Sequence, residues 1–238
     1  MLFRSKLEDG AGRVAPRNAG DAWLFRVRPG VTKIRFGEPG WRLGYARDAI
    51  NSYFVFKTLR AQGKLPKHLR FQVSIAAPNS AAPSRLFPNV ADTPIVREAY
   101  SAAVADEIAM ICAKIPHEDL AIQWDCSTEV QEAYGAGPGI AKETAIPSAA
   151  AQFAALCPAI PEKAALGYHL CFGTLGGWPR FAPDDLSACV DLANAVIEAS
   201  GRRVDWMHIP ALDTVEEKFY APLARLKPKG AKVYLGLV

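Results

Sequence analysis

The chain has 238 residues, of which half are apolar and 22% are charged, a composition typical of a globular protein of one or two domains. Its formal net charge of +4 is small for this length, so charge indicates neither a nucleic-acid-binding protein nor one that binds an anionic membrane. No apolar run approaches the roughly 18 residues of a membrane span, and the N-terminus lacks a signal-peptide pattern.

Five cysteines are scattered along the chain, and an odd number argues against a disulfide framework. We therefore expect a protein of the reducing cytoplasm. The helical patterns around Cys112, Cys157 and Cys189 place these three thiols on apolar faces, where they are expected to be part of the core.

The pattern divides the chain into an irregular segment, residues 1–44, and a regular domain, residues 45–238. The first segment is rich in glycine and arginine and shows no sustained periodicity. Helical and strand-like patterns alternate through the second. Helices are predicted at 46–62, 92–114, 148–156, 184–199 and 214–226, and strands at 70–76, 120–125, 166–172, 204–209 and 233–238.

Strands that alternate with helices favour a parallel sheet with right-handed crossovers. A doubly wound sheet or a (β/α)₈ TIM-type barrel would fit, but no glycine-rich dinucleotide or phosphate loop opens any helix, which favours the barrel. Five of the eight strand–helix units of a barrel are recognisable. The sequence thus predicts an incomplete barrel, either a partial chain or one whose sheet other copies complete, with self-association through apolar edges.

Reactive side chains gather at the carboxyl ends of these strands, where barrel enzymes carry their active sites. His169 and Cys171 lie two residues apart in one strand and would share a face, which is half of a tetrahedral zinc site. The alternative is that this pair is ordinary core, because cysteine is among the most buried residue types.

Other strand-end residues complete the candidate site. Asp125 and His208 are candidate acid–base groups, and Gln72, Ser74 and Trp124 are candidate substrate-binding residues. We expect Cys126 to point away from Asp125. Glu129 and Glu132, in the turn that follows, are expected to be solvated.

Five motifs form an ordered set that is similar to a known family: FQVS (71–74), DLAIQWD (119–125), LGYHLC (166–171), VDWMH (204–208) and YLGLV (234–238). From about Leu43 onward the chain resembles the C-terminal catalytic barrel of cobalamin-independent methionine synthase, in a superfamily that also contains uroporphyrinogen decarboxylase. The resemblance implies zinc held by His169 and Cys171, a thiol substrate, a folate or other methyl donor, and Asp125 on the substrate's amino group.

The chain departs from the family pattern at two ligands. Where the family has a glutamate on the next strand, this chain has His208, followed by Pro210 and Ala211. The family's distal cysteine would fall beyond Val238.

Three functions follow from these observations. The first is a zinc-assisted transfer of a methyl or other alkyl group to or from a thiol, with a small-molecule substrate and no nucleic-acid or membrane partner. The second is a metal-free lyase or decarboxylase-like enzyme that acts on a carboxylated substrate, with Asp125 and His208 in acid–base roles. The third is a non-catalytic fragment that only binds a ligand or partner.

Overall fold

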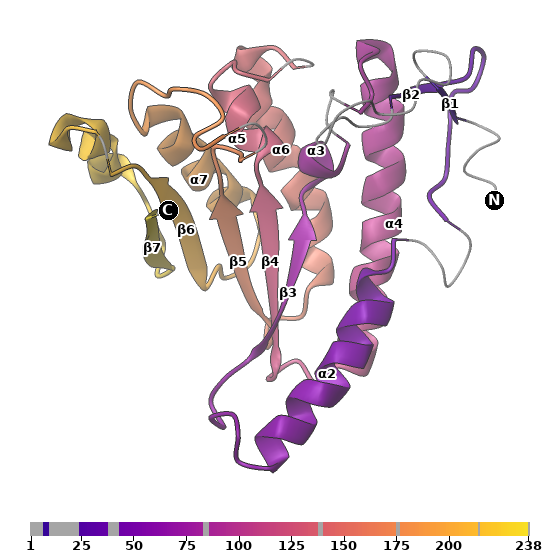
Figure 1. Ribbon diagram of the computed structural model, residues 1–238, viewed down its shortest axis with the longest axis vertical. Coiled ribbons are helices and arrows are strands. Elements are labelled where there is room, and N and C mark those ends of the chain that lie inside the picture. Colours follow the sequence, from indigo (N-terminus) through magenta and orange to yellow (C-terminus); the bar gives the residue numbers. More distant parts are fainter. Residues whose placement is uncertain are drawn as a thin grey trace.

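A parallel sheet of five strands forms the centre of the computed structural model (Figure 1). The strands lie in chain order: β3 (Phe71–Ala76), β4 (Leu120–Cys126), β5 (Ala165–Leu170), β6 (Trp206–Ala211) and β7 (Lys232–Leu237). Two short strands near the N-terminus, β1 (Leu7–Asp9) and β2 (Phe25–Val27), pair antiparallel. The structure describes residues 7–9, 24–37, 43–82, 86–137, 140–174, 177–213 and 215–237.

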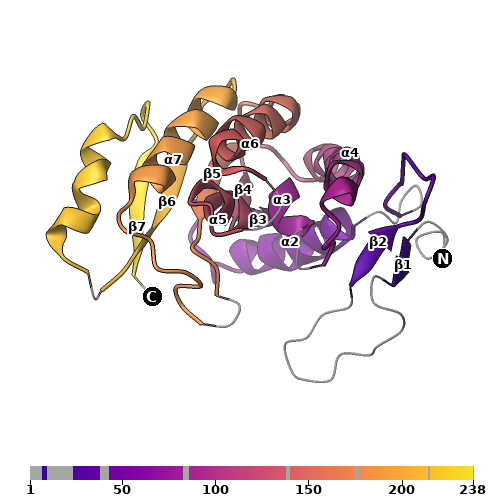
Figure 2. The same ribbon diagram turned by 90° about the horizontal axis from the view of Figure 1, so that it is seen from above.

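The predicted α/β organisation with a parallel sheet is confirmed, and each of the five predicted strands is present within two residues of its expected ends. Because the strands lie in chain order, each crossover adds the next strand at the same growing edge of the sheet. Right-handed crossovers then place their helices on one side of it. Seen end-on, the strands follow an arc with α4, α6 and α7 on its outer side (Figure 2).

The helical elements include the five predicted segments, together with short unpredicted pieces such as 78–81 and 157–159, and they differ from the prediction more widely in three places. They are α2 (Tyr45–Ala61), α3 (Pro78–Ala81), η1 (Val90–Asp92), α4 (Thr93–Lys114), α5 (Thr128–Ala133), α6 (Lys142–Leu156), η2 (Cys157–Ala159), α7 (Ser187–Ala199) and η3 (Glu217–Arg225). No described helix is long and apolar enough to cross a membrane.

The three differences have local causes. Helix α6 begins six residues earlier than predicted and contains Pro147, which lies early enough in the helix to be accommodated. Helix α5 was not predicted, because its buried face carries carboxylates rather than apolar residues. The predicted helix 214–226 is instead the 3₁₀ segment η3, since Pro222 lacks the N–H that an α-helical hydrogen bond needs there. Thr214, the first residue of that predicted helix, lies outside the described residues.

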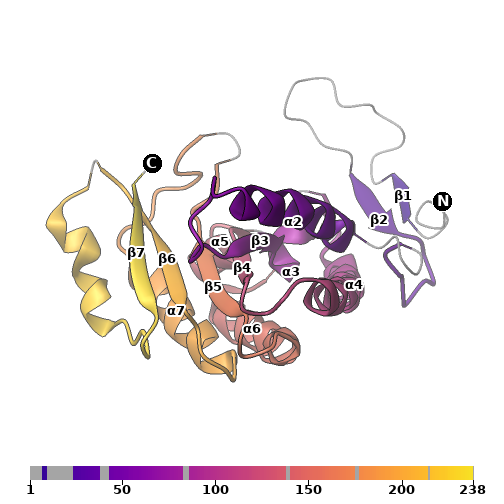
Figure 3. The ribbon, with the colours of Figure 1, turned by 90° about the horizontal axis from the view of Figure 1, so that it is seen from below.

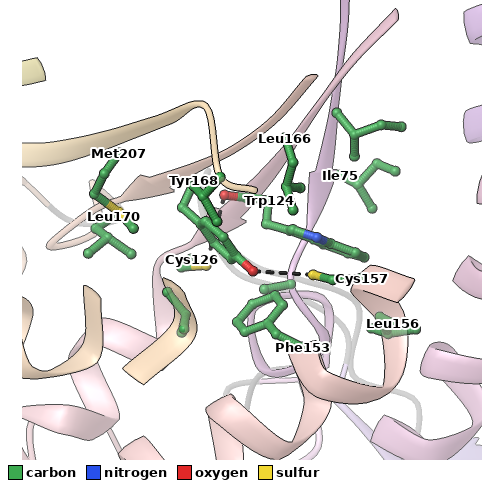
Figure 4. Close-up of a cluster of buried hydrophobic side chains, with 14 of the residues drawn as sticks. Ile75, Trp124, Cys126, Phe153, Leu156, Cys157, Leu166, Tyr168, Leu170 and Met207 are labelled. Atoms are coloured by element: carbon green, nitrogen blue, oxygen red, sulfur yellow. Dashed lines mark hydrogen bonds between the residues drawn. The ribbon is translucent and has the colours of Figure 1, made fainter. Parts of the chain in front are cut away.

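The core fills the space between the sheet and the outer helices (Figure 4). Alternate strand residues enter it, and Trp124, Tyr168 and Ile75 are fully buried. The Tyr168 hydroxyl contacts Cys157 Sγ at 3.2 Å and Ser200 Oγ at 2.7 Å, so this buried phenol has polar partners. Such burial is the main stabilising contribution to the fold.

A buried carboxylate attaches α2 to the domain. Glu107 of α4 accepts hydrogen bonds from the backbone N–H groups of Leu43, Gly44 and Ala46, at 2.7, 3.1 and 2.5 Å. Ala46 lies in the first turn of α2, and Leu43 and Gly44 immediately precede that helix, whose N-cap residue offers no side-chain hydrogen bond. Gly44 lies in the left-handed region at φ 97°, which brings these groups around the carboxylate.

Candidate functional site on the open face of the sheet

The strand residues that alternate away from the helices form the opposite face of the sheet, which we call the open face. Gln72 and Ser74 are exposed there, whereas Gln123, Asp125, His169, Trp206 and His208 are half-buried. A pocket of about 710 Å³ lies on this face. Its lining includes Arg70, Gln72, Gln123, Asp205, Trp206, His208, Lys232 and Tyr234.

Strand register arranges these side chains in two rows across the sheet. One row joins Ala76, Asp125, His169, His208 and Tyr234, each the register partner of the next. The second row, two residues earlier on each strand, joins Ser74, Gln123, Gly167, Trp206 and Lys232. The two rows are about 6.6 Å apart along the strands. We call them the histidine row and the amide row.

Two imidazoles are in direct contact in the histidine row. His169 Nδ1 and His208 Nδ1 lie 2.8 Å apart, with ring centroids separated by 4.7 Å. At this distance one Nδ1 donates a proton and the other accepts it, so at most one of the two nitrogens carries a hydrogen. Each ring keeps Nε2 for other partners. These two are among only four histidines in the chain.

The environment shifts the pKa values of two groups in this row, His208 and Asp125, in opposite directions. Burial lowers the pKa of His208, and the neighbouring His169 lowers it further, which favours a neutral imidazole. Burial raises the pKa of Asp125, although the hydrogen bond from Gln123 Nε2 at 2.9 Å and the nearby His169 partly offset this rise. A histidine that is easier to deprotonate thus lies near a carboxyl group that is easier to protonate.

Two glycines make room for the bulky side chains of β6. A Cβ added to Gly167 would lie 1.9 Å from Cε2 of Trp206, so the indole lies directly against the backbone of β5. A Cβ added to Gly236 would lie 2.2 Å from His208 Nε2. Neither glycine has a positive φ, so backbone conformation does not require glycine at these positions. Glycine is needed because a side chain would have no space there. The positions of Trp206 and His208 depend on these two residues.

The amide row is connected by hydrogen bonds around Gln123. Its Nε2 donates to Asp125 Oδ1 at 2.9 Å and to Ser74 Oγ at 3.4 Å, and its Oε1 accepts from Trp206 Nε1 at 3.3 Å. Gln72 Nε2 donates to Ser74 Oγ at 3.3 Å. Gln72 and Ser74 thus lie on the open face with the other candidate residues. Gln123 and Trp206 were not predicted as site residues. Gln123 orients Asp125 by its hydrogen bond, and Trp206 in turn holds Gln123.

Cys171 lies just beyond the end of β5. Its Sγ accepts a hydrogen bond from the backbone N–H of Gly173 at 3.2 Å. Burial raises the pKa of this thiol, and Asp125 contributes to the rise. Cys171 in turn contributes to the raised pKa of Cys189 in α7, so it lies between the open face and the helix layer. The neutral thiol is therefore the favoured form of Cys171.

The arrangement gives zinc an incomplete ligand set. A zinc ion in a protein takes three or four side-chain ligands, with cysteine as the thiolate. Among the described residues no group of three or more His, Cys, Asp or Glu side chains is placed to hold one metal ion. The residues present therefore do not fit a resident zinc, and we derive no step through one.

The structure corrects the predicted role of Trp124. Its side chain is fully buried in the helix-side core, against Phe153 at a centroid distance of 5.6 Å (Figure 4). Strand alternation explains the correction, because Gln123 and Asp125 lie on the open face and the residue between them must face away. Cys126 is buried as expected, and the indole of Trp206 takes the place on the open face that was expected for Trp124.

The expectation that Glu129 and Glu132 are solvated is also wrong. Both are buried, at 1% and 0% exposure. Glu132 pairs with Arg97 at 2.7 Å and accepts from Asn79 Nδ2 at 2.7 Å. Glu129 accepts from the Asn79 N–H at 2.8 Å and from the Ser80 hydroxyl at 2.5 Å. These contacts fix the loop after β3 at the carboxyl end of the sheet.

Comparisons with family models, with curated proteins and with solved structures give no match to this chain. The fold is thus established by the structure itself, and the methionine synthase-like resemblance stays an expectation from the sequence. The site has to be interpreted from its own geometry.

The first prediction concerns the histidine pair. Gly236→Ala should displace the His208 ring, because the new methyl group would overlap Nε2. We expect loss of the Nδ1–Nδ1 hydrogen bond and a rise of the His208 pKa toward its ordinary value of 6.5, measured by imidazole ¹⁵N NMR titration. Val233→Ala, on the other face of the same strand, is the control. Unchanged imidazole shifts in Gly236→Ala would contradict the packing described here.

The second prediction concerns Glu129, whose pKa burial raises from 4.5 to about 7. Between these values the folded protein holds a proton that the unfolded chain has released, so stability should fall as pH rises from about 4.5 through 7. The shift corresponds to a loss of about 3 kcal/mol.

Denaturant unfolding from pH 4.5 to 8 measures this effect, since Glu129→Gln cannot titrate. The difference in unfolding free energy between the wild type and Glu129→Gln should change over that range by about this amount. The exposed Glu118→Gln is the control. A difference that does not vary with pH would mean that folding does not raise the pKa of Glu129.

Proposed function

We propose that the open face is the active site of a metal-free lyase-type enzyme that acts on a small carboxylated substrate by acid–base catalysis. The observation that carries the proposal is the Nδ1–Nδ1 contact of His169 and His208 at 2.8 Å, next in register to Asp125. Perturbed titratable groups in a pocket are typical of catalytic sites. This is the second of the three functions that the sequence leaves open.

His208 is suited to the role of general base. Its lowered pKa keeps it neutral near pH 7. With its Nδ1 engaged by His169, its Nε2 is the nitrogen left to take a proton. In an elimination, His208 Nε2 would take the proton from the carbon next to the substrate carboxylate. The C–H electron pair then forms the new C=C bond as the bond to the leaving group breaks.

Asp125 is suited to the role of general acid. Its raised pKa increases the fraction of the carboxyl group that is protonated, and Gln123 holds it in place. It would give its proton to the departing group, so the proton count balances across the site. His169, between the two in the same row, orients His208 and can pass a proton back to Asp125.

A cation close to this row supports a carboxylated substrate. Lys232 lines the pocket in the amide row, one row from His208. At about 6.6 Å along the strands, an ammonium group could hold a carboxylate while His208 reaches the adjacent carbon. Arg70 is the other cation that lines the pocket at the amino ends of the strands. It donates from one Nη to the carbonyl oxygens of His117, Leu120 and Lys163, so its role is structural.

We also propose that the domain is part of a (β/α)₈ barrel. Supporting features are the sequential order of the five parallel strands, the helices on the outer side of the arc, and polar groups on the inner face at the carboxyl ends of the strands. In barrel enzymes this end carries the active site.

The third prediction tests the acid–base proposal by solvent exchange. In D₂O the wild type should exchange the hydrogen on the carbon next to the carboxylate in one or more members of a panel of 3-oxo and 3-hydroxy carboxylic acids, followed by ¹H NMR. His208→Gln should slow this exchange by a factor of roughly 100 or more, whereas Asp125→Asn, which removes the acid that protonates the leaving group, should slow elimination from the 3-hydroxy acids by a similar factor. Lys232→Met should mainly raise KM, because it removes binding to the carboxylate.

The control is Glu118→Gln, which lies outside the site. Exchange that persists in His208→Gln would remove His208 from the proposed role. A folded wild type that exchanges none of these acids would favour the non-catalytic function, in which the face only binds a ligand or partner.

The zinc-assisted transfer of a methyl or other alkyl group to or from a thiol, with a folate or other methyl donor, stays a second candidate. The observation in its favour is the spacing of His169 and Cys171 at the carboxyl end of β5. The incomplete ligand set and the raised pKa of Cys171 weigh against it.

The fourth prediction separates these two candidates by zinc content. We expect well under one zinc per purified chain, with no difference between the wild type and His169→Ala/Cys171→Ala. His117→Ala/Cys112→Ala is the matched control, a histidine and a cysteine away from the open face. Near-stoichiometric zinc that only the His169/Cys171 variant loses would overturn the metal-free proposal and support the thiol transfer.

A further inference from the structure

The chain that follows β5 passes over the open side of the sheet at the carboxyl ends of the strands. Residues 177–186 lead to α7, and we call them the β5–α7 loop. Viewed from above and from below, this orange segment lies on the concave side of the arc, opposite α6 and α7 (Figure 2 and Figure 3). In Figure 1 it lies beyond the arrowhead of β5. Loops at this end of a parallel sheet are the ones that contact ligands.

Aromatic contacts hold the loop on both sides of Arg180. The rings of Trp178 and Phe181 lie 6.0 and 5.5 Å from the ring of Phe172, which directly follows β5 and its Cys171. Phe181 also contacts Tyr134 at a centroid distance of 5.2 Å. The backbone that carries Arg180 is therefore fixed by packing.

These contacts place Arg180 beside the carboxyl ends of β4 and β5. Its backbone N–H donates to the carbonyl oxygen of Gly173 at 3.1 Å. A Cβ added to Gly173 would lie 3.4 Å from Arg180 Cβ and 3.3 Å from Ser127 Oγ, so the three residues adjoin. Ser127 follows Asp125 by two residues, which is about 6.6 Å along a strand. An arginine side chain can span that distance.

The guanidinium of Arg180 has no acidic partner. The residue is exposed, and no ion pair between described residues includes it. By contrast, Arg60, Arg97 and Arg225 each pair with a carboxylate of the protein. A guanidinium binds a carboxylate through two parallel hydrogen bonds. Arg180 thus offers the carboxyl end of the open face a carboxylate-binding group that the fold itself does not use.

Given the lyase function proposed above, we propose that Arg180 binds a second carboxylate of the substrate, which is therefore a 3-hydroxy dicarboxylic acid. Lys232 lies on the amino side of the histidine row and Arg180 on its carboxyl side, so the reacting carbons lie between two cations. His208 Nε2 takes the proton from C2, and the C–H electron pair becomes the C2=C3 bond. The hydroxyl group on C3 leaves as water with the proton of Asp125.

The spacing of the two cations selects the length of the acid. Lys232 is in the amide row with Gln123, and Ser127, beside Arg180, is four residues beyond Gln123, about 13 Å along the strands. The second carboxylate therefore has to be separated from C3 by further carbons. In malate it is bonded to the carbon that bears the hydroxyl group, which leaves no chain to reach Arg180. In 3-hydroxyadipate two methylene groups extend the chain past Asp125.

The fifth prediction is a preference for dicarboxylates in binding, measured by titration calorimetry with the unreactive acids adipate and hexanoate. The wild type should bind adipate roughly tenfold more tightly than hexanoate, because only adipate reaches both cations. Arg180→Gln should lose this preference and bind hexanoate as before, and Arg180→Lys, which keeps the charge, should restore part of it. Lys232→Met should weaken the binding of both acids. Arg35→Gln, an exposed arginine of the N-terminal segment, is the control.

Turnover of 3-hydroxyadipate and 3-hydroxyhexanoate separates this proposal from the lyase function. Arg180→Gln should raise KM for the diacid alone. A preference for adipate that Arg180→Gln abolishes, without turnover of either hydroxy acid, would support the carboxylate site and remove the lyase function. Turnover by a wild type that binds adipate no better than hexanoate would keep the lyase function and overturn the role of Arg180. A folded Arg180→Gln variant that keeps the preference would overturn that role too, with the fold checked by circular dichroism. If Arg180→Gln does not fold, an undiminished preference in Arg180→Ala or Arg180→Met would decide against it in the same way.

Discussion

The alternation of side chains along five parallel strands is the constraint on which the rest of the structure depends. All crossovers return on one side of the sheet, so every second strand residue is committed to the helix layer and the residues between them to the open face. Trp124 and Tyr168 illustrate the first set, and Asp125 and His169 the second. Because neighbouring strands are in fixed register, the side chains of the open face form rows, and groups far apart in sequence meet without any long loop.

This constraint explains how much could be predicted from the sequence. The apolar periodicity locates all five strands, and alternation alone indicates that Gln72, Ser74 and Asp125 share a face. The contact between His169 and His208 could not be predicted, because it depends on the register of β5 against β6 and on the space above Gly236. Trp124 was assigned by adjacency to Asp125, although adjacency on a strand means the opposite face.

Helix α5 shows a different limit of pattern reasoning. Glu129 and Glu132 look like solvent-facing residues, since burial of a carboxylate costs free energy unless it is hydrogen-bonded or paired. Here the compensating groups come from elements distant in sequence: Asn79 and Ser80 in α3, which follows β3, and Arg97 in α4. Only the folded chain brings these partners together. The same network holds the carboxyl ends of β3 and β4 in place, so it supports the end of the sheet where Asp125 lies.

The two faces of the sheet therefore have different roles in the protein. The helix side is apolar and fully packed, and it determines stability. The open face instead places titratable groups in half-buried positions, where burial lowers the pKa of His208 and raises that of Asp125, so that the two values move toward each other. Removing these groups from water costs free energy. The arrangement favours catalysis, because a base and an acid can coexist at one pH.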